Sequence, residues 1–288
     1  MAVAPAAIDV WAKRRRRVGE LRARQGFARQ LLNFYGALLG VQERAFNQAR
    51  DAQPPGESLA AYVAETVFAS VVDVSVAAGP DRLRSDVIRT VDEKDPRDIV
   101  RAWMSDEDQP MVERFLARAA LGPVLEALGV EARRACDGPR DPRHCPECGG
   151  PPQLSFFAEA NEDLATGPRL LVCARCGASW GFARMTCAGC GEDASARLNV
   201  FSERGATSGG RGSVVRGLPG GGPTTDHNPV FPHMRIEACD SCRRYLLSVD
   251  LATDRAAVPQ VDELAAIPLD LYARDRGYSK IIPNLMGF

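Results

Sequence analysis

At 288 residues the chain is long enough for two ordinary domains, and its 45% hydrophobic and 25% charged residues are typical of a globular protein rather than a disordered or fibrous one. Its formal net charge of −1 argues against nucleic acid as a partner, because nucleic-acid binders usually carry a strongly basic surface. No run approaches the roughly 20 apolar residues of a membrane span, so no membrane partner is expected.

The basic run at residues 13–17 does not look like an export signal. Such a signal continues into an uninterrupted apolar stretch, whereas Glu20, Arg22 and Arg24 follow here. We expect these arginines on the solvent face of a helix and the protein in the cytoplasm. Thiols are reduced there, so nine cysteines indicate metal binding or catalysis rather than a disulfide framework.

Residues 8–136 are predicted to be helical throughout. Apolar residues recur at helical spacing along 31–39 and 59–74, which gives each segment a one-sided stripe. The first stripe comprises Leu31, Leu32, Phe34, Tyr35, Leu38 and Leu39, and the second Leu59, Tyr62, Val63, Val67, Val71 and Val74. We expect five to seven helices around one core that includes Trp11 and Trp103.

Several residues predict where these helices begin and end. Gly79-Pro80 should stop the second segment. Asp95 is placed to cap a helix whose first position is Pro96, where the missing N–H costs nothing. Farther on, Gly122-Pro123 should interrupt the apolar segment that follows residue 110.

From about residue 137 the pattern changes to short β-like runs that alternate with cysteine pairs. The runs are QLSFF, RLLVC, SWGFARM, RLNVFSE, MRIEAC and YLLSVDL. Residues 204–229 form a Gly/Pro-rich stretch that is predicted to be a loop and lacks the spacing of a phosphate-binding loop. The tail after residue 252 predicts a short helix.

Four Cys-x-x-Cys pairs are the strongest chemical signal in the chain. They are Cys145/Cys148, Cys173/Cys176, Cys187/Cys190 and Cys239/Cys242. Two intervening residues let a tight turn aim both sulfurs at one point, and a glycine after the second cysteine supplies the left-handed backbone that the turn favours. Three of the four turns have this glycine, and the fourth has Arg243. Since an ion held tetrahedrally by four cysteines needs two such turns, eight thiols predict two mononuclear metal ions.

The intervals between the pairs predict which turns share an ion. They are 24, 10 and 48 residues long. The first interval can form a β-hairpin with its tip at 161–166. The second, GASWGFARMT, has no turn signal and is predicted to be one strand. At about 3.3 Å per residue, such a strand separates the two turns at its ends by roughly 30 Å. We therefore pair the first turn with the second and the third with the fourth. A hairpin in the middle interval would make this pairing wrong.

Other interpretations of these residues remain. The metal either only holds the fold together or supports further chemistry, and the sequence leaves both open. GASWG (177–181) fits the G-x-S-x-G elbow of serine hydrolases, but a strand rather than a helix is predicted after it. Cys136 is interpreted as a small buried residue, and the carboxylate pairs Glu162/Asp163 and Asp262/Glu263 as solvent or cap residues. No catalytic residue is assigned, and the chain is not expected to be an enzyme.

The cysteine half resembles a known family, the formate dehydrogenase accessory proteins FdhE. The matching segments, in family order, are CPECGGPP, LVCARCGASW, RMTCAGCG, RIEACDSCRRYLLSVDL and VDELAAIPLDLYARDRGYSK. The long 204–229 insertion and Arg243 depart from the family pattern. The resemblance implies two rubredoxin-like units, with the eight paired cysteines as ligands and iron favoured over zinc, although a tetrahedron of four thiolates suits either metal. It also implies a cytoplasmic maturation factor that binds the catalytic subunit of formate dehydrogenase.

Together these observations predict an α+β protein, with an all-helical N-terminal domain followed by two small rubredoxin-like, zinc-ribbon-like units of four cysteines each. The predicted limits are 1–136 for the helical domain, 137–186 and 187–252 for the metal units, and 253–288 for a tail that packs on the rest. Phe182 and Tyr245 could contact the client protein, although packing within half-buried strands is the favoured interpretation. The alternative functions are a nucleic-acid-binding zinc ribbon and a rubredoxin-type electron carrier.

Overall fold

The structure is a computed structural model that describes residues 6–159, 167–203, 213–215 and 229–288. By packing, the chain divides into two compact units. We call them the helical unit (1–150, 174–178 and 285–287) and the sheet unit (151–173, 179–284 and 288). The hairpin tip predicted at 161–166 and most of the predicted loop at 204–229 lie outside the described residues. The predicted domain limits remain predictions.

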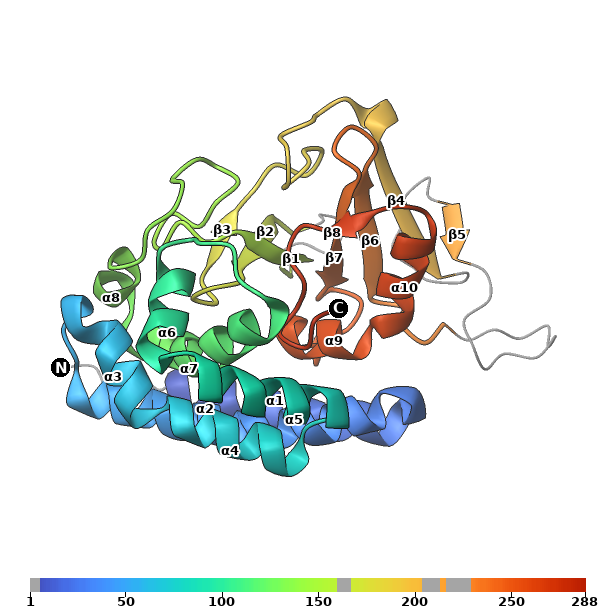
Figure 1. Ribbon diagram of the computed structural model, residues 1–288. Helices are drawn as coiled ribbons and strands as arrows, with labels where there is room; N and C mark the ends of the chain where they lie inside the picture. The colour runs from blue at the N-terminus through green and yellow to red at the C-terminus, as the bar shows by residue number, and fades with distance from the viewer. Residues whose placement is uncertain (1–5, 160–166, 204–212, 216–228) are drawn as a thin grey trace. The chain divides into compact units, whose positions relative to one another are not determined.

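The described part of the helical unit contains eight α-helices, coloured blue to green in Figure 1. Their bounds are α1 (Ala6–Arg24), α2 (Arg29–Ala52), α3 (Leu59–Thr66), α4 (Phe68–Ala78), α5 (Asp81–Glu93), α6 (Pro96–Met104), α7 (Met111–Leu128) and α8 (Val130–Arg134). The expected five to seven was therefore too few. The 59–78 segment divides at Val67, and the short α8 lies before the first cysteine turn.

Most residues of the predicted stripes lie in the core of the helical unit. In α2 every residue of the first stripe except the half-buried Leu31 is buried, and α2 packs against α1, α4 and α7. Trp11 and Trp103 are each 3% exposed, so both lie in the core as predicted. The basic run of α1 is only partly a solvent face. Arg15 and Arg16 are exposed, but Arg17 is buried and pairs with Glu20 at 3.2 Å.

Two of the predicted helix ends are confirmed. Helix α4 ends at Ala78, directly before Gly79-Pro80. Asp95 caps α6, because its carboxylate accepts the Arg97 N–H at 2.7 Å while Pro96 occupies the first helical position.

The break predicted at Gly122-Pro123 is wrong, since α7 runs through it without interruption. A proline inside a helix removes the N–H that would bond the carbonyl four residues earlier, here that of Ala119. The buried side chain of Gln42, on α2, donates to the Ala119 carbonyl at 3.2 Å. A neighbouring helix thus satisfies the acceptor that Pro123 leaves unpaired.

One stretch of the helical unit is more apolar than we expected. Gly56–Ala78 is 23 residues long and contains an 18-residue window with a mean hydropathy of 1.6, so by length and composition alone it could cross a membrane. The expectation that no run approaches a span was therefore wrong. In the structure the stretch forms α3 and α4, divided at Val67, and Leu59, Val63 and Val71 are fully buried. A third of the window is buried, so one face of the stretch packs into the core of the helical unit.

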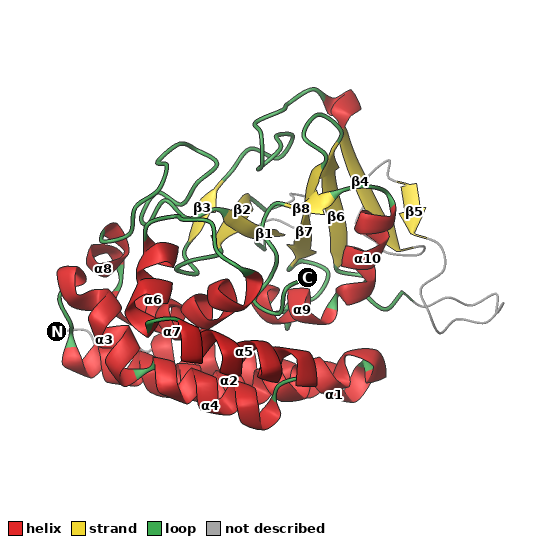
Figure 2. Ribbon diagram, in the orientation of Figure 1, coloured by secondary structure: helices red, strands yellow, loops and turns green. Residues whose placement is uncertain are grey.

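The described part of the sheet unit contains eight strands (Figure 2). They are β1 (Pro152–Phe157), β2 (Arg169–Cys173), β3 (Ser179–Gly181), β4 (Leu198–Glu203), β5 (Ser213–Val215), β6 (Met234–Cys239), β7 (Arg244–Asp250) and β8 (Ser279–Lys280). Five predicted runs form strands over most of their length, but SWGFARM is extended only in β3. The middle interval is therefore part strand and part loop.

All these strands belong to one sheet, in the order β3-β2-β1-β7-β6-β4-β5, with β8 beside β7. Strands β1 and β2 lie between the first two cysteine turns, and β4 and β6 between the last two. The parallel pair β1–β7, with Leu154 opposite Leu247, joins the two sets. The predicted fold class, helices followed by two four-cysteine units, is confirmed. The shared sheet was not anticipated.

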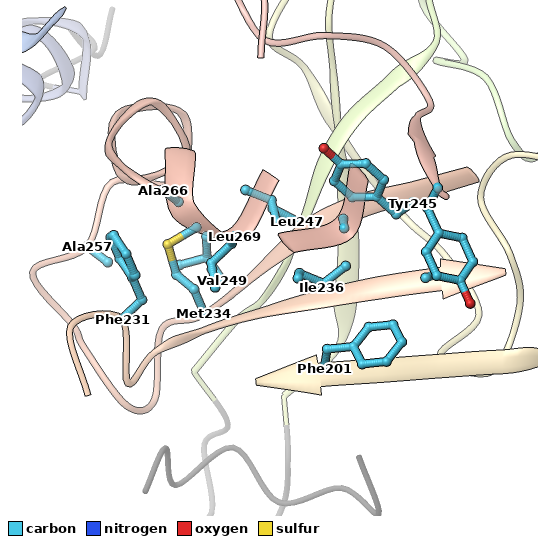
Figure 3. Close-up of a cluster of buried hydrophobic side chains, with 13 residues drawn as sticks. Phe201, Phe231, Met234, Ile236, Tyr245, Leu247, Val249, Ala257, Ala266 and Leu269 are labelled. Carbon is cyan, nitrogen blue, oxygen red and sulfur yellow. The ribbon is translucent and has the colours of Figure 1, made fainter. Parts of the chain in front are cut away.

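The tail forms two helices, α9 (Pro259–Ala265) and α10 (Ile267–Asp275), where one was expected. Helix α9 packs against β1 and β7, and α10 against β6 and β7. Figure 3 shows the core between them, where Ala266 and Leu269 meet Met234 and Val249 of the strands. This core holds the strands that lead into and out of the last cysteine turn.

Candidate metal centres

The first four-cysteine group consists of Cys145, Cys148, Cys173 and Cys176, whose sulfurs all lie within 4.8 Å of one another. The Sγ atoms of Cys145 and Cys176 are 3.7 Å apart. The second group consists of Cys187, Cys190, Cys239 and Cys242, also within 4.8 Å. The structure thus brings the first turn to the second and the third to the fourth, as the intervals predicted.

The turns of both groups have the backbone geometry that the spacing requires. In the first turn the Gly149 N–H donates to the Cys145 carbonyl at 2.9 Å, and in the third the Gly191 N–H donates to the Cys187 carbonyl at 2.9 Å. Gly149, Gly177 and Gly191 all have a positive φ, of 69°, 71° and 84°. Backbone N–H groups also bond the sulfurs directly, from Gly150 to Cys148 at 3.4 Å and from Gly189 to Cys187 at 3.3 Å.

The fourth turn reaches the same conformation without a glycine. Arg243 has φ 54°, in the left-handed region that a Cβ makes unfavourable. Its side chain makes three contacts that offset this strain. The guanidinium pairs with Asp240 at 3.0 Å, donates to the Arg276 carbonyl at 2.7 Å and lies 4.1 Å from the centre of the Tyr278 ring.

Both groups fit a tetrahedral metal ion. With metal–sulfur bonds of about 2.3 Å, a regular tetrahedron places its sulfurs about 3.8 Å apart. The Cys187–Cys242 and Cys190–Cys239 sulfur distances are 3.7 Å and 3.8 Å, and the nine cysteines of the chain are free thiols. These spacings exceed a disulfide bond of about 2.05 Å by far. The donor set suits zinc and iron equally.

The two groups differ in their exposure to solvent. All four cysteines of the first group are buried, and the most exposed of them, Cys173, is 3% exposed. In the second group Cys187 and Cys239 are buried, but Cys242 is half-buried and Cys190 is exposed. One centre is therefore closed to water and the other is open on the Cys190 side.

Arg175, inside the second cysteine turn, explains how the first group is closed. Its side chain is fully buried and pairs with Asp106 at 2.7 Å. It also donates to the Cys148 carbonyl at 2.8 Å and to the Asp137 carbonyl at 2.7 Å, while the Trp103 ring lies 5.3 Å away. One arginine therefore connects both turns of the first group to the end of α6.

The chain segment after α10 supports the second group. The Tyr278 hydroxyl donates to Asp240, inside the fourth turn, at 2.6 Å, and the Ser279 N–H donates to the Arg243 carbonyl at 2.9 Å. The side chain of Ile281 faces Gly189 of the third turn, where an added Cβ would be 3.4 Å from it. This segment, residues 278–281, therefore touches both turns of the second group.

Lys280 anchors this segment in the core of the sheet unit. Its ammonium pairs with Glu263 at 2.7 Å and Asp270 at 3.0 Å, and all three side chains are buried. Burial lowers the pKa of Lys280, but the two carboxylates outweigh it and the pKa is raised overall. Burial also raises the pKa of Glu263 above its usual value, although the Lys280 charge opposes this. The expectation that Glu263 is a solvent or cap residue was wrong.

Other candidates from the sequence are placed as follows. Tyr245 is buried, with its hydroxyl donating to Asp270 at 2.8 Å, so the structure does not support a client contact there. Phe182 is half-buried and lies under the Arg169 guanidinium, in agreement with strand packing. Cys136 is buried as expected, and burial raises the pKa of its thiol to about 12. Ser179 of the G-x-S-x-G pattern begins β3.

Sequence reasoning missed a third set of potential ligands, His233, Asp254 and Asp262, whose donor atoms also lie within 4.8 Å of one another. Asp262 is buried and accepts the Val258 N–H at 2.8 Å, at the start of α9, while its other oxygen contacts His233 Nε2 at 2.8 Å. Asp262 therefore does act as a cap residue. We interpret the set as a contact that fixes the start of α9 against the chain before β6.

The helical unit and the two groups of four thiols define a protein with two candidate metal centres, each of which could hold an ion on four cysteines. Three comparisons with known proteins agree on its relatives. Residues 224–286 match the family described as "FdhE, C-terminal domain". A "Protein FdhE homolog" of Aquifex aeolicus is 25% identical over 207 residues, which cover 71% of this chain and 62% of the relative. Another from Pseudomonas aeruginosa is 30% identical over 143 residues, covering 49% and 38%.

A solved structure, "The crystal structure of the FdhE protein from Pseudomonas aeruginosa", matches with a TM-score of 0.61 over 96% of this chain and 95% of that one. At 22% identity this likeness concerns the fold. The aligned part spans less than two thirds of each of these two curated relatives. Together the matches confirm the resemblance to the FdhE family that the cysteine motifs predicted.

Proposed function

We propose that this chain is an accessory protein required for formate dehydrogenase activity, and that it acts in the cytoplasm by binding the catalytic subunit of that enzyme. The observation that carries the proposal is the pair of four-cysteine groups, formed by all eight paired cysteines, in a chain similar to FdhE proteins. In this role the chain supplies a binding surface and does not itself catalyse formate oxidation.

The two ions have a direct physical part in this proposal. The sheet contains strands that lie between the two turns of each four-cysteine group. An ion in each group would therefore fix the ends of those strands. The ligands are Cys145, Cys148, Cys173 and Cys176 in the first group and Cys187, Cys190, Cys239 and Cys242 in the second. Iron is the metal that the family resemblance favours, and zinc is the alternative. Iron would add one-electron chemistry, which zinc does not support.

Deletion of the gene in its host tests the proposal. We expect formate oxidation to be lost while the transcript of the dehydrogenase is unchanged, and to return on complementation with the full chain. Purified chain with an affinity tag should retain the catalytic subunit from the same cells, identified by mass spectrometry. Normal formate oxidation in the deletion strain would refute the proposal.

The alternative functions give different results. A nucleic-acid-binding protein would retain DNA or RNA in a filter assay at moderate salt, and we expect no retention because the net charge is −1. A rubredoxin-type electron carrier requires iron, so zinc alone in chain purified from iron-rich cultures would exclude it.

A further inference from the structure

Each of the two groups consists of four cysteines, but the groups differ in how far solvent reaches their sulfurs, and this difference has a chemical consequence. A donor from solution can replace a thiolate on a metal ion only if it reaches the ion. In the first group all four cysteines are buried, whereas in the second Cys190 is exposed and Cys242 half-buried. An approach from solution is therefore available only at the second group.

The surroundings of the second group distinguish one sulfur from the others. Cys187 is buried and accepts the Gly189 N–H at 3.3 Å, and Cys239 is buried as well. Such N–H bonds hold a thiolate in place around an ion. Cys190 Sγ lies 3.8 Å from Cys239 Sγ, and Cys190 is the exposed cysteine of the group. Cys190 is thus the most accessible ligand of the group.

The equivalent cysteine of the first group, Cys148, has the opposite surroundings. It also ends a Cys-x-x-Cys turn, but it is 0% exposed and accepts the Gly150 N–H at 3.4 Å. Its own carbonyl is bonded by the buried Arg175. Displacement of Cys148 would require the turn and Arg175 to move together.

We infer that the second group is an exchangeable metal centre, at which a thiolate or nitrogen donor from outside the chain displaces Cys190, while the first group is a permanent structural centre. In the exchange one donor replaces another, and the released Cys190 thiolate takes a proton from water, so no electron is transferred. This inference rests on the proposed binding of two ions.

The test uses the full chain loaded with zinc and the colour-forming chelator 4-(2-pyridylazo)resorcinol. Metal analysis first establishes the stoichiometry. On addition of chelator we expect zinc to be released in two phases of equal amplitude, the faster from the second group. The rate constant of the fast phase should be at least about ten times that of the slow phase, since supporting contacts alter metal affinity by about this factor or more. Iodoacetamide added during the fast phase should label Cys190 first and Cys242 next, and leave Cys145, Cys148, Cys173 and Cys176 unlabelled.

Two matched variants identify the phases. Cys190→Ser should remove the fast phase and keep the slow one. Cys148→Ser should remove the slow phase, or lower the melting temperature more than Cys190→Ser does. Release of both ions at one rate, or earlier labelling of the first group, overturns the inference but leaves the proposed function intact. A chain that holds fewer than two ions overturns the metal part of the proposed function itself.

Discussion

The two four-cysteine groups have the same kind of turns and the same set of donor atoms, yet their surroundings differ. The first is closed by Arg175 and by close backbone contact, since a Cβ on Gly149 would lie 2.7 Å from the Gly138 carbonyl carbon. The second is open at Cys190 and is supported by the segment 278–281. Ligand spacing thus determines that an ion can be held, while the residues around the turns determine how firmly it is held and what can reach it.

The largest expected effect concerns the support of the second group. Lys280→Met leaves Glu263 and Asp270 buried together without their cation, so the free energy of unfolding should fall by about 4 kcal/mol. Urea unfolding followed by circular dichroism measures this loss. The double variant Lys280→Met/Asp270→Asn should recover part of it. No loss in the single variant would show that the anchor does not support this region.

A second test compares the two arginines that contact the turns. Arg175→Met should cost about 3 kcal/mol, because the buried guanidinium bonds two carbonyls and Asp106. Arg243→Met should cost only about 1 kcal/mol, because the exposed ion pair with Asp240 and one hydrogen bond to a carbonyl are lost while the backbone strain remains. Thermal unfolding of the two zinc-loaded variants measures the difference. Equal costs would contradict the distinction between a closed and an open centre.

The third prediction concerns the ion pair that joins strands of the two metal units. Burial opposes ionisation of Glu237 on β6, but the charges of Arg169 on β2 and Arg235 outweigh it and hold its pKa below the usual 4.5. A lowered pKa in the folded state stabilises the fold above the unfolded-state pKa, and this stability is lost as the pH falls through the folded-state value.

Glu237→Gln should therefore cost about 2 kcal/mol at pH 7 and flatten the dependence of stability on pH below about pH 5. Urea unfolding at about pH 3 and about pH 7, on either side of the usual glutamate pKa, measures both effects. A variant that loses stability with acid as steeply as the wild type would show that Glu237 does not contribute to this dependence.

The smallest effects test the turns themselves. Gly177→Ala places a Cβ where φ is +71° but where no atom lies within 4 Å, so it should cost about 1 kcal/mol through backbone strain alone. Gly181→Ala is the control, because its φ is not in the left-handed region and it has equally open surroundings, and it should change stability by about 0.5 kcal/mol or less.

Arg243→Gly, which relieves strain but removes the contacts with Asp240 and Tyr278, should likewise be nearly neutral. Thermal unfolding of the three variants checks the order, and a neutral Gly177→Ala would show that its turn tolerates a side chain.

Much of the site could be predicted from the sequence because its determinants are local. A Cys-x-x-Cys turn needs only neighbouring residues. The turn signals and lengths of the intervals led to the correct pairing, although the middle interval is a strand only over β3. The helix end before Gly79 and the cap at Asp95 were predictable for the same reason. Even Arg243 adopts the backbone conformation that the pattern required of a glycine.

The features that could not be predicted depend on residues far apart in the chain. Helix α7 continues through Pro123 because Gln42, 77 positions from Ala119, bonds the carbonyl of that residue. The burial of Glu263 depends on Lys280 and on Gln153 of β1, 110 positions away. The ion pair of Arg175 likewise cannot be predicted from neighbouring residues, because its partner Asp106 lies 69 positions away.

The parallel pairing of β1 with β7 has a practical consequence for dissecting this protein. Cutting the chain between the metal units would separate β1 from β7. Each fragment would then have an edge strand with unpaired N–H and C=O groups, which can form hydrogen bonds with a strand of another copy. Fragments that contain a complete set of four cysteines should therefore self-associate rather than remain as separate folded modules. The pair of metal units is better treated as one indivisible building block.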